Sequence, residues 1–304
     1  MGAKLGRPGP LGRWRNQTTS EAINGSPRAL APPGVKAMLG ELLDAVEIGL
    51  SGCAGDRRWI AVDADTGERI ANKRGPTDPR LRACRAELVD DSDDELPLRV
   101  TLPDGEILQG REIEGALAQL LERRIRLEQA DTPALGRIAA TGAHHDAAPI
   151  HLITTSTLAH LRAIAPTSDW DVRRFRPNLL LDDGTTPTAF AEDALVGGAL
   201  RGPSGLKLTV VLPTPRCVVP TRGREELPAD PGILRTLVQQ HRVDLGPFGR
   251  QGCIGAYAEV AHAGQISVGE ILDIETPPQP PEAAIPEALE AVLQQLSSLE
   301  GDGS

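Results

Sequence analysis

Cysteine and aromatic residues are scarce in this 304-residue chain, and long apolar runs are missing. The four cysteines, Cys53, Cys84, Cys217 and Cys253, contain neither a C-x-x-C pair nor the C-x4-C-x2-C spacing of iron–sulfur proteins. The spacing argues against a structural zinc site and an in-chain ferredoxin-type cluster. The low cysteine count gives no sign of a disulfide framework and favours a reducing, cytoplasmic setting. Aromatics are 2% of the residues, so the core must be built from Leu, Val, Ile and Ala.

An excess of positive charge is also missing. The chain has 32 Lys and Arg against 42 Asp and Glu, a formal net charge of −10. A negative field of this size argues against nucleic acids and anionic membranes as partners. No run approaches the roughly 18 apolar residues of a membrane span, so we expect no membrane association.

The composition divides the chain into four segments. Residues 1–33 are basic and rich in Pro and Gly, which predicts a disordered leader without the apolar stretch of a secretory signal. Residues 34–130 and 146–274 carry the strand and helix patterns of two domains. Residues 276–304 are typical of a Pro-rich spacer followed by an amphipathic helix.

Short strands separated by Gly and Pro turns, with few helices, predict a mainly β (α+β) protein built as a barrel or a sandwich. Helices are expected over 116–128, over 234–241, and from the Thr155–Thr157 hydroxyl cluster to a stop at Pro166. Strands are expected over 59–62, 98–102, 179–181, 206–212, 217–219, 256–260 and 266–268.

Cys217 is the first candidate for chemistry. It follows Pro213-Thr-Pro-Arg216, in which prolines stiffen the backbone and the arginine favours the thiolate. A thiolate binds soft metals or attacks electrophiles. A lone cysteine is more often a buried small hydrophobic residue, so its position alone leaves both interpretations open.

Cations beside turns form a second pattern. In an acidic protein they indicate a bound anion, typically a phosphate held by arginine forks and by hydroxyls at a helix start such as Thr155. Each cation could equally be a surface residue or half of a salt bridge, and the sequence does not show that they converge. They are Lys36, Arg57, Arg58, Lys73, Arg74, Arg176 and Arg216.

Two further features receive structural interpretations. Adjacent His144 and His145 would face opposite ways on a strand and have no partners at zinc-like spacing, so we expect a solvated loop. Cys253 lies shortly before Tyr257 and is expected to be a packed thiol.

The order of the motifs resembles the MOSC family (molybdenum cofactor sulfurase C-terminal domain) preceded by its N-terminal β-barrel domain, and is similar to the mitochondrial amidoxime reducing component group. The resemblance runs from about residue 34 to 273. Its motifs are Val35-Lys36, Gly55-Asp-Arg-Arg-Trp59, Lys73-Arg74, Asp146-Ala-Ala-Pro149, His151-Leu-Ile-Thr-Thr155, Phe175-Arg-Pro-Asn178, Ala191-Glu-Asp193, Pro213-Thr-Pro-Arg-Cys217, Gly255-Ala-Tyr-Ala-Glu-Val260 and Ile266-Ser-Val-Gly269.

The resemblance implies an N-terminal β-barrel-like domain over 34–130, a MOSC β-barrel with a few peripheral helices over 146–274, and a Mo-molybdopterin cofactor. The cysteine of the T-x-R-C motif would coordinate the metal, which assigns Cys217 to molybdenum. The positions that would hold the cofactor or lie near it are Lys36, Arg57, Thr155, Thr157, Arg176, Asn178, Arg216 and Tyr257.

The implied activity is two-electron reduction of N-hydroxylated small molecules by a molybdenum oxidoreductase. Because no iron–sulfur motif is present, electrons would come from a separate iron–sulfur, flavin or haem protein. Two alternatives stay open: sulfur transfer by a Cys217 persulfide, and a non-catalytic cofactor carrier. The chain departs from the family pattern at Ala37, where serine is frequent, and over 222–230, which lacks the usual D-P-x-T-G turn.

Overall fold

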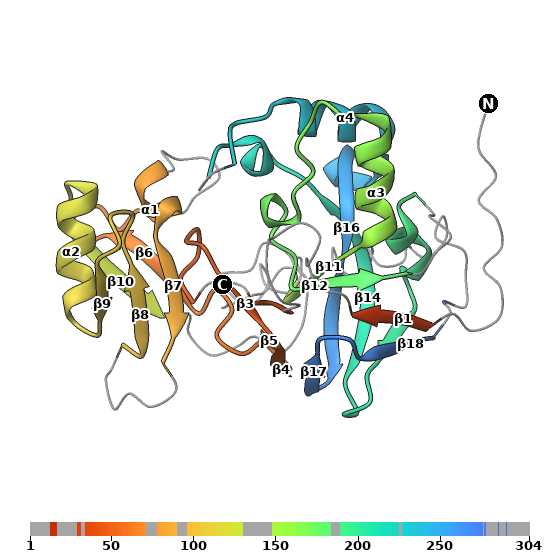
Figure 1. Cartoon of the computed structure of the whole chain (residues 1–304), viewed down its shortest axis with the longest axis horizontal. Helices are drawn as coiled ribbons and strands as arrows, with labels where there is room; N and C mark the ends of the chain where they lie inside the picture. Colours follow the sequence, from red (N-terminus) through yellow and green to blue (C-terminus); the bar gives the residue numbers. More distant parts are fainter. Residues whose placement is uncertain are drawn as a thin grey trace, which may run out of the picture.

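Two strand-rich units lie side by side in the computed structural model, one built mainly from residues 59–129 and the other mainly from residues 148–275 (Figure 1). This confirms the predicted mainly β (α+β) class. Among the residues described, no helix is long and apolar enough to cross a membrane. The structure describes residues 13–16, 29–31, 34–70, 78–89, 96–129, 148–183, 189–224 and 227–275, with Pro277, Ile285 and Glu290.

The N-terminal unit contains two small antiparallel sheets and two helices around a core of its own. One sheet pairs β6 (Trp59–Asp63) with β10 (Ile125–Gln129). The core of the N-terminal unit includes the fully buried Ile113 and Leu117. The second sheet and the helices are β7 (Arg85–Leu88), β8 (Leu98–Thr101), β9 (Ile107–Gln109), α1 (Pro79–Ala83) and α2 (Glu112–Leu121).

Helix α2 begins earlier and ends earlier than the helix predicted over 116–128. It stops because Glu122 adopts a left-handed conformation, with φ 57°. Beyond it, Ile125 and Leu127 alternate with exposed residues and enter β10. The predicted helix was wrong over residues 122–128, because leucine and isoleucine spacing over a few residues fits both the helix and the strand period.

A closed ring of strands forms the second unit. Its sheet runs from β11 (Ile150–Thr154) to β16 (Arg250–His262), and β11 also pairs directly with β16. Seven strands therefore form a barrel, and β15 (Arg242–Asp244) extends the sheet beyond β16. Around the ring the order is β11, β12 (Leu179–Asp182), β1 (Arg13–Asn16), β18 (Ile271–Glu275), β13 (Ala199–Arg201), β14 (Lys207–Pro215) and β16.

Two strands fall inside the segment 1–33, which the sequence predicts to be a disordered leader. Strand β1 pairs with both β12 and β18, and β2 (Ala29–Ala31) pairs with β3 (Glu41–Leu43). These strands differ from the prediction because sheet edges offer hydrogen-bonding partners that no local pattern reveals. The rest of this segment lies outside the described residues.

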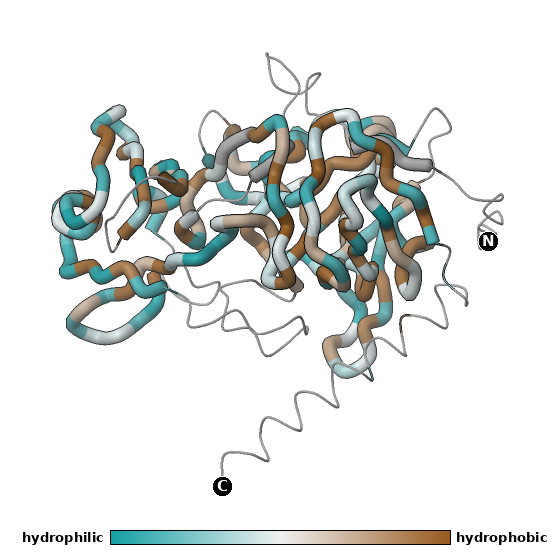
Figure 2. The backbone as a smooth tube through the Cα atoms, turned by 90° about the horizontal axis from the view of Figure 1, so that it is seen from below, coloured by the Kyte–Doolittle hydropathy of each residue, from teal (hydrophilic) through white to brown (hydrophobic). Residues whose placement is uncertain are grey.

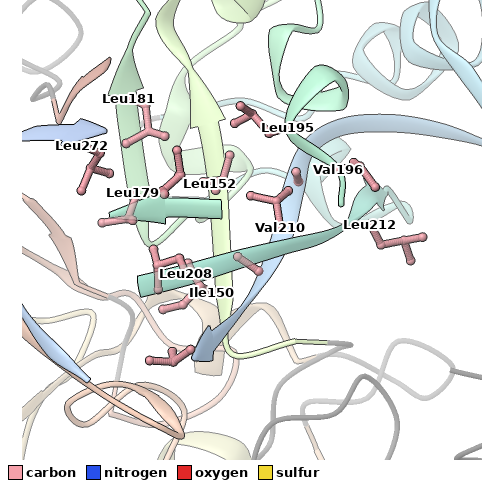
Figure 3. Packing of buried hydrophobic residues seen from close by; sticks show 14 of the residues in the cluster. Ile150, Leu152, Leu179, Leu181, Leu195, Val196, Leu208, Val210, Leu212 and Leu272 are labelled. Atoms are coloured by element: carbon pink, nitrogen blue, oxygen red, sulfur yellow. The ribbon is translucent and has the colours of Figure 1, made fainter. Parts of the chain in front are cut away.

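The barrel core is aliphatic, as the scarcity of aromatics predicts. Along β14, buried Leu208, Val210 and Leu212 alternate with more exposed residues. They pack with Leu152 and Leu179 from neighbouring strands (Figure 3). Figure 2 shows brown hydrophobic and teal hydrophilic residues interleaved along the tube, as this inward and outward alternation requires.

Part of the N-terminal sequence packs with the barrel instead of with its own unit. Strand β4 (Ala45–Gly49) pairs with β5 (Gly52–Cys53) and with β17 (Gly264–Ser267), far along the chain. Val46 and Ile48 of β4 join the barrel core. The two units are therefore tied together by sheet pairing and by shared burial.

Short helices surround the barrel. Helix α3 (Thr155–Ile164) is capped by Thr154, whose Oγ1 accepts from Thr157 N at 3.3 Å, and it ends shortly before Pro166 as predicted. The strand predicted over 217–219 is wrong: the chain there leaves β14 and enters a 3-10 turn. The remaining elements are α4 (Gly232–Gln240), η1 (Val172–Arg174), η2 (Ala191–Leu195), η3 (Val219–Thr221) and η4 (Gly246–Phe248).

The spacer and helix predicted over 276–304 lie almost entirely outside the described residues. Ile285 is described, and it is buried against the barrel core.

The barrel core predicts a clear contrast between two aliphatic truncations. Leu208→Ala should lower the free energy of unfolding by about 2–5 kcal/mol, because a fully buried side chain leaves a cavity. Ile271→Ala, at a side chain 37% exposed on β18, should change it by much less. Urea unfolding of both variants measures this, and equal losses would contradict the assigned core.

Candidate functional site

Cys217 lies at the point where β14 ends and η3 begins. Pro215 is the last residue of β14, and Pro220 lies within η3. The segment that carries the thiol therefore has a proline on each side, and the ring of proline fixes the φ angle. Cys217 is half-buried, whereas Cys53, Cys84 and Cys253 are buried. All four cysteines are described, and Cys217 is the one that a ligand can reach.

Cys217 lines a pocket between the two units. Its empty volume, open mouth included, is about 1010 Å³. Six of the residues predicted to form the site line this one pocket, and they come from segments far apart in the sequence. They are Lys36, Arg57, Arg176, Arg216, Cys217 and Tyr257.

The pocket is strongly cationic although the chain is acidic. Among the described lining residues, the one carboxylate is Asp78, and both of its oxygens accept from Arg80, at 3.1 Å from Nε and 2.9 Å from Nη2. A pocket so unbalanced in charge favours an anionic ligand. The lining cations are Lys36, Arg57, Arg82, Arg174, Arg176, Arg216 and Arg222.

Asn178 holds Arg57 in place without lining the pocket itself. Its Nδ2 donates to Asp56 Oδ2 at 3.0 Å, and the same oxygen accepts from Arg57 Nη1 at 2.7 Å. Asn178 Oδ1 in turn accepts from His151 N of β11 at 2.8 Å. This buried amide therefore links the barrel to the N-terminal unit.

Backbone strain is concentrated at the pocket. Five non-glycine residues in the described ranges have positive φ, and three of them line it: Ala37 (78°), Arg57 (48°) and Arg176 (54°). Arg176 Nη1 donates to Ala37 O at 3.2 Å, a second link between the units. Conformations of this kind cost of order 1–3 kcal/mol each and persist where the surrounding structure enforces them, commonly at binding sites.

Three contacts hold Arg216 in place, and one nitrogen of its side chain takes part in none of them. Its main-chain N donates to Gly252 O and its Nη2 donates to Phe175 O, each at 2.9 Å. The guanidinium also lies 5.7 Å from the centre of the Phe175 ring. Its Nε is buried with no hydrogen-bond partner among the described residues. A buried donor without a partner costs free energy unless a ligand satisfies it.

His151 lines the pocket, a position that its sequence motif did not predict. Burial, followed by the nearby charge of Arg216, holds the pKa of His151 well below its usual value, so the imidazole is neutral. Its ring lies 5.7 Å from that of Tyr257, the residue opposite it in the β11–β16 register. The strand pattern at 150–154 could have placed His151 opposite Tyr257 only if the pairing of two distant strands were known.

The hydroxyls of Thr155 and Thr157 do not reach the pocket. Thr155 Oγ1 donates to Asp182 Oδ1 and Asp183 Oδ1, each at 3.3 Å. Thr157 is fully buried and donates to Glu192 Oε2 at 2.6 Å. Both hydroxyls therefore hydrogen bond to carboxylates at the start of α3, the helix start that the sequence predicted.

Cys253 is a packed thiol in the structure. Its Sγ contacts Gln251 O at 3.5 Å, and burial raises its pKa to about 12. Burial likewise raises the pKa of Cys53 and Cys84 to about 12. These three thiols stay protonated at neutral pH and are unsuited to metal binding or nucleophilic attack.

Arg174 supports the segment that follows Cys217. The buried guanidinium donates to Pro228 O at 2.9 Å and to Pro220 O at 3.5 Å, and it pairs with Asp169 at 2.9 Å. The backbone on either side of Arg222 is thereby held against η1. The cations of the Lys73-Arg74 motif and the His144-His145 pair lie outside the described residues.

The MOSC domain is the family whose model matches this chain, over residues 140–273. The family predicted from the sequence motifs is thus confirmed for that region. The match covers most of the barrel unit, and the N-terminal unit lies outside it.

Similar solved structures include two from bacilli. The YUAD protein from Bacillus subtilis is 11% identical, with 88% of this chain and 98% of that chain covered and a TM-score of 0.43. YiiM from Geobacillus stearothermophilus is 17% identical, with 41% of this chain and 53% of that chain covered and a TM-score of 0.30. No curated protein matches the chain.

The buried carboxyl that holds Thr157 predicts a specific pH dependence. Burial raises the pKa of Glu192 from 4.5 to about 7. Because the folded-state pKa is the higher one, the stability that this group contributes is complete below pH about 4.5 and is lost as the pH rises through about 7.

Glu192→Gln should therefore show a smaller fall in the free energy of unfolding between pH 4.5 and pH 8, by about 3 kcal/mol. Urea unfolding across this range measures it, with Glu47→Gln at an exposed side chain as the matched control. Parallel pH profiles for wild type and Glu192→Gln would contradict the assignment.

Proposed function

We propose that the pocket binds a pyranopterin molybdenum cofactor and that the protein reduces N-hydroxylated small molecules. The observation that supports this most strongly is the convergence, in one pocket, of the accessible Cys217 with Lys36, Arg57, Arg176 and Arg216. The match to the MOSC domain over residues 140–273 points to the same cofactor class.

The residues present fit such a cofactor. A thiolate is a ligand that suits a soft or high-valent metal, and several cations suit a phosphate and an anionic dithiolene. The buried Nε of Arg216 is a donor in need of an acceptor. His151, being neutral, adds a polar group without adding charge.

When bound, the cofactor supplies the two-electron chemistry that amino-acid side chains lack. Cys217 Sγ would be the protein's ligand to the metal. Arg57, Arg176 and Arg216 would neutralise and orient the phosphate, and their fixed hydrogen bonds to Asp56, Ala37 O and Phe175 O keep the cost of ordering low. Tyr257 offers a phenolic hydroxyl at the pocket wall.

The reaction balances as a two-electron, two-proton reduction. The N–O bond of the substrate breaks, the nitrogen keeps a hydrogen in place of the hydroxyl, and the hydroxyl leaves as water. The electrons would come from a separate iron–sulfur, flavin or haem protein, because the sequence holds no iron–sulfur motif.

Sulfur transfer is the second candidate, favoured by the contrast between Cys217 and the three buried cysteines. A partner's persulfide would pass its outer sulfur to the Cys217 thiolate, and the partner's thiolate would leave. A protein that only carries the cofactor would use the same pocket without turnover.

Metal and pterin analysis of the purified full chain separates these functions. Wild-type protein from a host that makes the cofactor should hold near-stoichiometric molybdenum and pterin. Cys217→Ala should lose most of the molybdenum, because it removes the one accessible thiolate among the described residues. Cys84→Ala should keep it, because Cys84 is buried in the core of the N-terminal unit.

Loaded wild-type protein should then reduce benzamidoxime with a chemical reductant. Bound molybdenum without turnover would leave the carrier role. Sulfane sulfur on Cys217 without molybdenum would favour sulfur transfer, and neither molybdenum nor pterin in wild-type protein would defeat both cofactor-dependent functions.

A further inference from the structure

Asp193, the last residue of the Ala191-Glu-Asp193 motif, lies beside a histidine that belongs to none of the sequence motifs. Asp193 is part of η2, and its Oδ2 lies 2.8 Å from His241 Nε2. The other ring nitrogen, Nδ1, lies 2.9 Å from Cys253 O of β16. The side chains of Asp193 and His241 are 22% and 14% exposed, so the pair is mostly buried. It is called the Asp193–His241 clamp below.

Both ring nitrogens of His241 face acceptors, so the ring must carry a proton on each nitrogen to make both hydrogen bonds. A neutral imidazole has a single N–H and could donate to only one of the two acceptors. Burial by itself would lower the pKa of His241, but the hydrogen bond and the charge of Asp193 outweigh burial and hold the pKa above its usual value. A cation is also favoured here because His241 caps the C-terminal end of α4.

The ring of Phe190 fixes the orientation of the imidazole. The two rings are stacked, with their centroids 3.7 Å apart and their planes inclined by 9°. An aromatic face at this distance attracts a cation. Phe190 has a φ of 54°, a left-handed conformation that costs free energy and persists where the surrounding structure enforces it. His241 is therefore held by α4, by β16 and by the start of η2.

The Asp193–His241 clamp fixes the part of β16 that holds the residue before Cys217. Cys253 N donates back to His241 O at 3.0 Å, so two hydrogen bonds join β16 to the end of α4. Gly252 lies so close to α4 that a Cβ there would be 3.0 Å from the backbone of the helix. Gly252 O in turn accepts from Arg216 N at 2.9 Å, and Cys217 is the next residue.

Strand β14 depends on this support because its pairing is irregular just before Cys217. The register of β14 with β16 shifts between Pro213 and Pro215, and Pro215, opposite Cys253, has no N–H to donate. The hydrogen bond from Arg216 N is therefore the one that ties the chain to β16 immediately before the thiol. On the other side of Cys217, η3 contacts α4 as well.

Deprotonation of His241 would leave one of its ring nitrogens facing an acceptor without a proton between them. Because the folded-state pKa is raised, the stabilisation is complete below the ordinary pKa of 6.5 and is lost as the pH rises through the raised value. Several titratable or charged groups lie around the ring. They are Glu192 and Asp193 of η2, His160 of α3, Arg242 of β15, Cys253 of β16 and, beyond Gly252, Arg216.

We propose that Asp193 and His241 are positioning residues for Cys217: their ion pair holds Gly252 and Cys253 in place and, through Arg216 N, fixes the segment that carries the thiol. The Asp193–His241 clamp itself follows from the hydrogen bonds of the chain, and its importance for the reaction rests on the proposed reductase function. Loss of the Asp193 carboxylate or deprotonation of His241 loosens this segment.

The first experiment measures the clamp without the reaction, in the full chain purified from a host that does not make the cofactor. At pH 7 the 15N chemical shifts of the His241 ring should be those of an imidazolium, and a neutral ring would overturn the clamp. Amide hydrogen exchange at Arg216, corrected for the intrinsic exchange rate, reports how often its bond to Gly252 O opens. We expect Asp193→Asn to increase this opening about tenfold or more, because a hydrogen bond between charged groups is lost.

The pH profile separates a charged clamp from ordinary packing. In wild-type protein the opening at Arg216 should increase as the pH rises through the titration of His241, which the 15N shifts follow. In Asp193→Asn the opening should already be high at pH 7 and should change little above it. Glu192 titrates nearby, with a pKa that burial raises to about 7. Glu192→Gln should therefore keep the pH step, and a step that disappears in Glu192→Gln but persists in Asp193→Asn would overturn the clamp.

His160→Gln is the matched control for the loss of a histidine beside Phe190. The rings of His160 and Phe190 meet edge to face, with centroids 5.6 Å apart, and His160 makes no hydrogen bond to Asp193 or to β16 among the described residues. This variant should leave the exchange at Arg216 unchanged. Asp193→Asn/His241→Gln should open Arg216 no more than His241→Gln alone, because both side chains act through one clamp. Additive losses, or an equal loss in His160→Gln, would overturn the proposal.

Steady-state kinetics of the protein loaded with the cofactor give the second readout. Asp193→Asn should lower kcat for benzamidoxime, per bound molybdenum, about tenfold and change KM little, because the geometry at the reacting centre is disturbed while substrate binding is kept. An unchanged kcat would contradict a positioning role for the reaction. If wild-type protein does not reduce benzamidoxime, the proposed function fails, and amide exchange at Arg216 still decides whether Asp193 and His241 hold the Cys217 segment.

Discussion

The hydrogen bonds of one buried amide connect the two halves of the pocket. Asn178 accepts from the backbone of β11 and donates to Asp56, which holds Arg57. Hydrogen bonds between buried side chains therefore fix the position of the Arg57 guanidinium relative to the barrel. Arg176 adds a second connection through Ala37 O. These two links lie at the pocket itself, whereas the β4–β17 pairing joins the two units away from it.

Cations held this closely need a scaffold that outweighs their repulsion. Part of it is the barrel, closed by the β11–β16 pairing, which gives fixed positions to His151, Tyr257 and the end of β14. Another part is the pairing of Asp56 with Arg57, of Asp78 with Arg80 and of Asp169 with Arg174, which offsets part of the positive charge around the pocket. The acidic surface of the whole chain and its cationic pocket are thus compatible, because the two are separated in space.

The sequence predicted the class of fold, the family and six pocket residues. Short motifs with fixed spacing can be recognised without knowing which strands pair with one another. Cys217 and Arg216 could be found since a T-x-R-C motif is local. His151, Arg82 and Arg222 could not, because they reach the pocket through strand pairing and packing between distant segments. The hydroxyl of Thr157 donates to the buried Glu192, a partner that the sequence could not show because a hydroxyl at a helix start can bind either a carboxylate or a phosphate. The end of α2 depended on the left-handed Glu122, which the apolar spacing does not encode.

Strand β4 has a consequence for what counts as a domain here. The family match begins at residue 140, yet Val46 and Ile48 fill the barrel core and β4 supplies the hydrogen-bonding partner of β17. A fragment that began at residue 140 would expose that core and would lack Lys36, Arg57 and Arg82. A gene fusion or a deletion that moved the matched segment alone would therefore leave part of the pocket lining behind.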